Sequence, residues 1–147
     1  MNILLLTEEP MDQMIFRDAV AGLSSHHTLV VCDSIGNVWE KLKSRQIAVP
    51  NIIFLHIELS RSYDHELVEI FKRNPHLKSV PIVVLADTVL LDEISYIYGL
   101  QISCFVTLPQ DPIRRRDKFR ACLEFWSVHA ELPELQRWWP KDPDTTK

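Results

Sequence analysis

The chain has 147 residues, of which 46% are hydrophobic and 24% are charged, a composition typical of one ordinary globular domain. It contains only 3 glycines and none of the glycine-rich motifs that cradle nucleotide phosphates, which excludes nucleotide-binding enzymes of those kinds. The net charge of −4 gives no general attraction to nucleic acids or anionic membranes, so neither is expected as a partner.

Five short apolar runs, rich in Ile, Val, Leu and Phe, recur along the chain. They lack polar–apolar alternation, which is typical of strands buried on both faces of a parallel sheet. The runs cover residues 2–6, 28–33, 51–57, 81–86 and 102–107.

Helical segments separate these runs, and each places apolar residues on one face. In the first, the predicted inner face holds Met11, Met14, Ile15, Ala19 and Leu23. The following three segments have their apolar residues at Ile35, Val38, Trp39 and Leu42, then at Leu67, Ile70 and Phe71, then at Leu90, Leu91, Ile94, Ile97 and Tyr98. The last is predicted to begin with Asp111 as N-cap and Pro112, and to bury Phe119, Cys122, Leu123 and Trp126.

This alternation predicts a three-layer, doubly wound (βα)5 domain with helices on both faces of a five-stranded parallel sheet. We expect the flavodoxin-like strand order 2-1-3-4-5. The domain is predicted to cover residues 1–131, and residues 132–147 form a tail with Trp138 and Trp139. Because aromatic residues are enriched at interfaces, the pair either covers its own domain or docks onto a second copy or a partner.

The cysteines and the amino-terminal segment indicate a cytoplasmic protein. Cys32, Cys104 and Cys122 lie far apart in apolar runs, so they are predicted to be reduced core residues. The first residues lack the basic region of a signal peptide, and no stretch reaches the roughly 18 apolar residues that span a bilayer.

In such a sheet the functional crevice lies beyond the carboxyl ends of the strands, where the strand order reverses. The loops at this edge are predicted to be residues 7–9, 56–58, 86–87 and 108–109. A candidate site must therefore be built from their side chains.

Four segments at these places resemble the landmarks of the response-regulator receiver domain: ILLLTEEPMD, PNIIFLHIEL, VPIVVLADT and CFVTLPQD. The resemblance extends in order over residues 2–130, and RNPHLKSVPIVVLA is similar to the family's passage from third helix to fourth strand. FWSVHAELP is similar to the end of single-domain regulators of the phytochrome-associated type. The resemblance implies two-component (phosphorelay) signalling, with a histidine kinase or an effector as partner.

The family's phosphorylation site uses an Asp after the third strand, acidic Mg²⁺ ligands after the first, a Thr or Ser after the fourth and a Lys after the fifth. At these positions this chain has His56, Thr7 and Glu8, Ala86 and Leu108, with Glu9 and Glu58 nearby. Two positions keep the family's residue type. They are the aromatic switch position, Phe105, and the proline directly after Leu108, Pro109. By the same resemblance, the Leu108–Pro109 bond is expected to be cis.

These differences predict a degenerate phosphorylation pocket. An imidazole cannot form an acyl phosphate, and it is a poor ligand for Mg²⁺. Ala86 has no hydroxyl, and Leu108 removes the cation that would balance a phosphoryl group. We therefore expect no aspartyl phosphorylation, no cofactor and weak or absent Mg²⁺ binding.

His56 admits three interpretations. In the favoured one it is half-buried and hydrogen-bonded to Glu8 or Glu58. In the second, Glu8, Glu9, His56 and Glu58 form a weak site for a transition ion such as Zn²⁺. In the third, its imidazole senses pH beside the carboxylates.

Two further charged or titratable groups are predicted to lie on the surface. Residues 114–116 are three arginines, either a solvated face helped by Asp111 and Asp117 or a contact for an acidic partner. His26 and His27 are predicted to form a solvated turn at the opposite end of the sheet from the crevice.

The sequence thus predicts a signalling interaction module, a pseudo-receiver that acts by protein–protein contacts and not as an enzyme. Its expected contact surface is the face of the fourth helix, fifth strand and fifth helix, residues 90–132 including Phe105, which could also form a homodimer, as could the tail. The alternatives are a regulator phosphorylated on His56 or Glu58 and, less favoured, a metal-dependent enzyme.

Overall fold

The computed structural model describes residues 1–57, 62–87 and 91–133. Its strands are β1 (Asn2–Leu6), β2 (Thr28–Cys32), β3 (Ile52–His56), β4 (Ile82–Ala86) and β5 (Cys104–Thr107). The helices are α1 (Pro10–Ala21), α2 (Ile35–Lys43), α3 (Ser62–Arg73), α4 (Leu91–Gly99) and α5 (Pro112–Glu124), and the π-helical turn η1 (Phe125–His129) continues α5. None of the described helices is long and apolar enough to cross a lipid bilayer.

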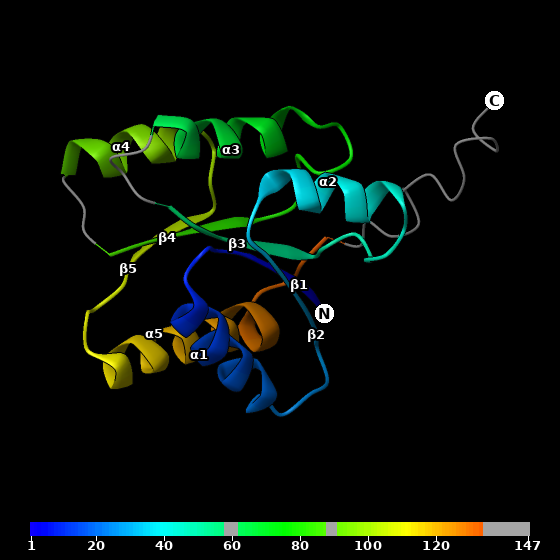
Figure 1. Cartoon of the computed structure of the whole chain (residues 1–147). Helices are drawn as coiled ribbons and strands as arrows, with labels where there is room; N and C mark the ends of the chain where they lie inside the picture. Colours follow the sequence, from blue (N-terminus) through cyan, green and yellow to red (C-terminus); the bar gives the residue numbers. More distant parts are fainter. Residues whose placement is uncertain (58–61, 88–90, 134–147) are drawn as a thin grey trace.

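The five strands form one parallel sheet in the order β2-β1-β3-β4-β5, as predicted. Figure 1 shows that α2, α3 and α4 cover one face of this sheet and that α1 and α5 cover the other. The predicted three-layer flavodoxin-like fold is therefore confirmed. The carboxyl ends of β1, β3 and β4 meet at one edge of the sheet, where the crevice was expected.

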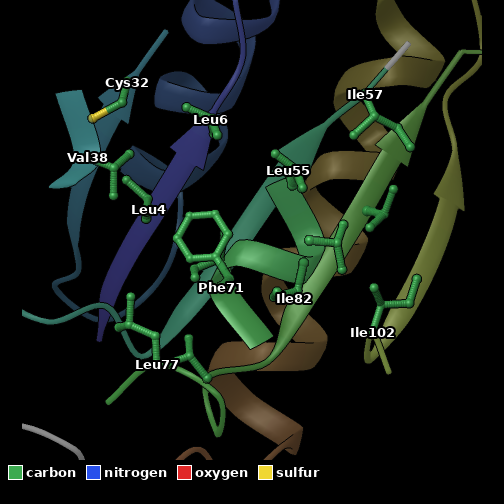
Figure 2. Close-up of a cluster of buried hydrophobic side chains, with 14 of the residues drawn as sticks. Leu4, Leu6, Cys32, Val38, Leu55, Ile57, Phe71, Leu77, Ile82 and Ile102 are labelled. Atoms are coloured by element: carbon green, nitrogen blue, oxygen red, sulfur yellow. The ribbon is translucent and has the colours of Figure 1, made fainter. Parts of the chain in front are cut away.

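The core consists of two layers of side chains, one on each face of the sheet. Because successive residues of a strand point to opposite faces, each central strand contributes to both layers and reads as a continuous apolar run. Under α2, α3 and α4 the layer includes Leu4, Leu6, Leu55, Phe71 and Ile82 (Figure 2). Under α1 and α5 it includes Ile3, Leu5, Phe16, Phe54 and Phe119.

Helix α1 presents a different face to the sheet from the one predicted. Met11 and Met14 are each 58% exposed, whereas Asp12, Phe16, Ala19 and Val20 are buried. Helical spacing alone predicted that the two methionines are core residues. In the structure Phe16 packs against the sheet instead, and Asp12 is buried because it forms an ion pair with Arg115. The prediction was therefore wrong for Met11 and Met14 and correct for Ala19.

The start of α5 agrees with its predicted signal. Asp111 accepts a hydrogen bond from the Arg114 backbone N–H at 3.0 Å, and Pro112 is the first helical residue.

The last described residues of the chain contact the domain. Leu132 packs against the layer under α1 and α5, and Asn51 Nδ2 donates to the Pro133 carbonyl at 3.5 Å. Trp138 and Trp139 lie outside the described residues, so the role predicted for the tail stays a prediction.

Cys32 is buried, whereas Cys104 and Cys122 are half-buried against the layer under α1 and α5. Burial raises the pKa of Cys32 and Cys104 and raises that of Cys122 to about 11. Because only the thiolate reacts, we expect iodoacetamide at pH 7.5 to alkylate native Cys122 about 100-fold more slowly than it alkylates the chain unfolded in urea. Mass spectrometry of time-resolved samples measures both rates. Equal rates would contradict the burial of this thiol.

Candidate functional site

The crevice contains a cluster of polar side chains from five different parts of the fold. Thr7 follows β1, Asp12 lies in the first turn of α1, His56 ends β3 and Asp87 follows β4, while Arg115 reaches in from α5. We call these five residues the Arg115 cluster: Thr7, Asp12, His56, Asp87 and Arg115. The parallel sheet brings them together because all its strands end at this edge.

Arg115 is the centre of the cluster. Its Nε donates to Asp12 Oδ1 at 2.6 Å and its Nη2 to Asp12 Oδ2 at 2.7 Å, a bidentate ion pair in which both side chains are about nine-tenths buried. The same Nη2 donates to Asp87 Oδ1 at 2.7 Å, and Nη1 donates to the Pro109 carbonyl at 3.3 Å. One guanidinium thus joins α1, the loop after β4 and the loop after β5.

His56 lies beside this ion pair with its side chain only 10% exposed. Its Nδ1 is 2.9 Å from Thr7 Oγ1 and 3.6 Å from Asp12 Oδ2, and its Nε2 is 3.4 Å from Asp87 Oδ1. Thr7 Oγ1 also accepts from the Glu9 backbone N–H at 3.2 Å. Which of Thr7 and His56 donates in their shared hydrogen bond depends on the tautomer of the imidazole.

Arg115 is the permanent cation of the cluster. Burial would lower the pKa of its guanidinium, but the hydrogen bonds and charges of Asp12 and Asp87 outweigh burial and raise the pKa above its usual value. A phosphoryl dianion entering the cluster would meet the carboxylates of Asp12 and Asp87, and it would compete with them for the Arg115 guanidinium.

Ala86 and Leu108 occupy the two other pocket positions named from the sequence. Each is 1% exposed, and the Leu108 backbone N–H donates to the Ala86 carbonyl at 2.8 Å. The Leu108 side chain packs into the layer under α1 and α5. Neither residue presents a polar side chain to the crevice.

The structure brings only some of the predicted residues together. Thr7 and His56 are in contact, while Glu8 and Glu9 are exposed. Glu58 lies outside the described residues, so its predicted hydrogen bond to His56 and its part in a metal site are untested. The described contacts of His56 are with Thr7, Asp12 and Asp87.

Sequence reasoning placed Asp87 in a loop at the crevice but gave it no role, and it did not assign Asp12 or Arg115 to the site. The prediction of a solvated face was wrong for Arg115, which is only 8% exposed because two carboxylates and a carbonyl bind its guanidinium. The spacing of residues along α5 could have indicated that Arg115 is buried. Arg115, Phe119 and Leu123 follow at intervals of four residues, and all three are buried on one stripe of α5.

The Leu108–Pro109 bond is trans, since the described chain contains no cis peptide bond. The expectation of a cis bond was therefore wrong. Without a specific constraint an X–Pro bond prefers trans by about 0.5–1 kcal/mol. Here the Leu108 side chain lies in the core and the Pro109 carbonyl accepts a hydrogen bond from Arg115.

The switch position, Phe105, lies in β5 and is half-buried. Its ring packs against the layer under α2, α3 and α4, and its backbone N–H donates to the Tyr98 hydroxyl of α4 at 3.1 Å. Tyr98, predicted to lie on the inner face of its helix, is 46% exposed. Its hydroxyl ties α4 to β5.

Arg115 binds the two described carboxylates of the cluster, through both oxygens of Asp12 and through Oδ1 of Asp87. Mg²⁺ needs several oxygen ligands in octahedral geometry, so a Mg²⁺ ion would have to compete with the guanidinium for them. Among residues 1–57, 62–87 and 91–133, no group of three or more His, Cys, Asp or Glu side chains is arranged to hold a metal ion.

Comparisons with known proteins agree on one relationship. No protein-family model matches the chain. The response regulator Rcp1 of Synechocystis sp. (strain ATCC 27184 / PCC 6803 / Kazusa) is 22% identical over 135 residues, which cover 89% of this chain and 92% of Rcp1.

Two solved structures share the fold at a TM-score of 0.80 each. The phosphorylated cyanobacterial phytochrome response regulator RcpA is 24% identical, and the alignment covers 90% of this chain and 98% of RcpA. The Mn²⁺-bound form of Rcp1 is 22% identical, with 90% of this chain and 99% of that one covered. The chain is thus similar to the response regulator Rcp1 over nearly its full length, and it shares the fold of the RcpA and Rcp1 structures.

Proposed function

We propose that this chain is an atypical receiver, a pseudo-receiver that signals through protein–protein contacts and without aspartyl phosphorylation. The observation that carries the proposal is the Arg115 cluster, in which a buried guanidinium already binds both described carboxylates of the crevice. The proposed activity is not catalytic and needs no cofactor.

The residues at three of the pocket positions support the loss of phosphoryl chemistry. His56 replaces the acceptor Asp, and Leu108 directs its side chain into the core where the family has a lysine. Ala86 has no hydroxyl to contact a phosphoryl oxygen. RcpA is described in a phosphorylated form and Rcp1 in a Mn²⁺-bound form, whereas this chain is proposed to take neither group.

In this proposal the Arg115 guanidinium takes the place of the two cations of the family's site, the Mg²⁺ ion and the lysine at the position of Leu108. Its bonds to Asp12, Asp87 and the Pro109 carbonyl hold three segments in one arrangement without an added ion. In this proposal the loop after β4 is held in a single state. A partner that changes the state must bind the two arrangements with different affinity.

The proposed contact surface is the face formed by α4, β5 and α5, where the Tyr98–Phe105 hydrogen bond joins two of these elements. A histidine kinase or an effector is the proposed class of partner, and a second copy of the chain could occupy the same face. Trp138 and Trp139 of the tail are proposed as a further contact. Neither nucleic acid nor a membrane is proposed as partner, and the proposed location is the cytoplasm.

The geometry of His56 disfavours phosphorylation on its own ring. Nδ1 is engaged by the Thr7 hydroxyl, and Nε2 faces the Asp87 carboxylate at 3.4 Å. A phosphoryl group on either nitrogen would displace a hydrogen bond or meet a like charge. The metal-dependent enzyme has no supporting cluster in the described residues.

The test is incubation with Mg²⁺ and acetyl phosphate or beryllofluoride, followed by intact-protein mass spectrometry and NMR. We expect no phosphoryl adduct and no shifts around residues 56 and 86. The His56→Asp variant should also stay unlabelled, because Leu108 and Ala86 still fail to stabilise the phosphoryl oxygens. A stoichiometric adduct on the native chain would refute the pseudo-receiver, and labelling of the variant alone would show that only the acceptor is missing.

A further inference from the structure

A second pocket lies at the opposite end of the sheet from the Arg115 cluster, where the strands begin. The end of α1, the α1–β2 loop and the start of β2 line an open surface pocket of about 580 Å³. Its lining includes Arg17, Leu23, Ser24, His26, His27 and Leu29. This volume falls within the range of small-molecule sites, which are commonly about 300–1,000 Å³.

The lining combines polar and apolar side chains. Arg17 contributes a guanidinium, Ser24 a hydroxyl and His27 an imidazole, whereas Leu23 and Leu29 are apolar. No lining residue is acidic, and within the described part of the chain no carboxylate forms an ion pair with Arg17. Arg17 thus brings a positive charge to the pocket that no described carboxylate pairs with.

We propose that this pocket binds a small organic carboxylate, with its carboxylate on Arg17 and its apolar group against Leu23 and Leu29. The planar guanidinium presents two parallel N–H groups that match the two oxygens of a carboxylate. This proposal is independent of the pseudo-receiver, because the pocket shares no residue with the Arg115 cluster.

His27 adds a hydrogen-bonding atom that the described protein does not use. Its Nε2 lies 2.9 Å from Ser25 Oγ, while its Nδ1 is buried without a hydrogen-bond partner. Burial is the main cause that lowers the pKa of His27 below the usual 6.5, followed by the positive charges of the amino terminus and of His26. Arg17 is the arginine of the lining, and the single charge of its guanidinium matches the single charge of a carboxylate.

The test is a titration with benzoate at pH 7.5, followed by the backbone amide signals of residues 17–29 in two-dimensional NMR. We expect saturable shifts confined to this segment. The Arg17→Gln variant should bind benzoate at least about tenfold more weakly, because it loses a charge-assisted bidentate contact. Arg120→Gln, which changes an exposed arginine of α5, should bind like the native chain.

Benzamide, which has the same shape without the charge, serves as the matched ligand control, and inorganic phosphate tests the charge. Both should bind more weakly than benzoate. Arg17 is exposed, so its replacement should preserve the fold, which the spectrum of the variant verifies. The proposal is overturned if benzoate moves no signal, if Arg17→Gln binds equally well, or if benzamide or phosphate binds as well as benzoate. None of these failures affects the phosphodonor experiment.

Discussion

Replacement of Arg115 by methionine is expected to lower the free energy of unfolding by about 3–5 kcal/mol, the usual cost of leaving one partner of a buried ion pair alone. The change removes three charge-assisted hydrogen bonds and leaves the buried Asp12 carboxylate without its guanidinium. Urea unfolding followed by circular dichroism measures the loss.

Two variants make this result specific. Arg114→Met changes the neighbouring, exposed arginine and should alter the stability by no more than about 0.5 kcal/mol. The double variant Asp12→Asn with Arg115→Met should be less destabilised than the sum of its single changes, with a coupling of about 1–3 kcal/mol. If Arg115→Met costs no more than Arg114→Met, the cluster does not stabilise the domain as the structure indicates.

Replacement of Phe16 by alanine should cost about 3–5 kcal/mol, as is typical when a fully buried aromatic side chain is truncated. Phe16 is 0% exposed, and its ring meets Phe54 of β3 at 5.0 Å and Phe119 of α5 at 5.3 Å between ring centres, both edge to face. These contacts fasten α1 to the sheet and to α5, the two helices that carry Asp12 and Arg115.

Met14→Ala is the matched control for this prediction. Met14 lies two positions earlier on the same helix, but it is 58% exposed. Its truncation should change the midpoint of urea unfolding only slightly. Equal losses for the two variants would mean that α1 does not pack against the sheet through Phe16.

The fold could be predicted because its signals are local and redundant. Each central strand is a short apolar run that points side chains to both faces, and Asp111 with Pro112 marks a helix start through backbone chemistry alone. The orientation of α1 could not be predicted in the same way. Met11 and Met14 have suitable spacing, but packing against Phe54 and Phe119 selects Phe16 as the inward residue.

The site was harder to predict because its charges come from distant parts of the chain. Thr7 and His56 were found, since strand ends in a parallel sheet are easy to locate. Asp12 and Arg115 are helical residues, and only the tertiary fold brings them together. A charged residue is ordinarily expected on the surface, and nothing local to Arg115 indicates a carboxylate partner.

The same separation has a consequence for biosynthesis. Asp12 and Arg115 are 103 positions apart, so the ribosome synthesises α1 long before it adds Arg115, whose guanidinium pairs with the Asp12 carboxylate. Until α5 emerges, the nascent chain has no Phe119 to cover Phe16 and no guanidinium for Asp12. The domain can therefore reach its native state only near the end of translation, and a chain truncated before α5 would display an apolar, acidic surface to the chaperones that act on incomplete proteins.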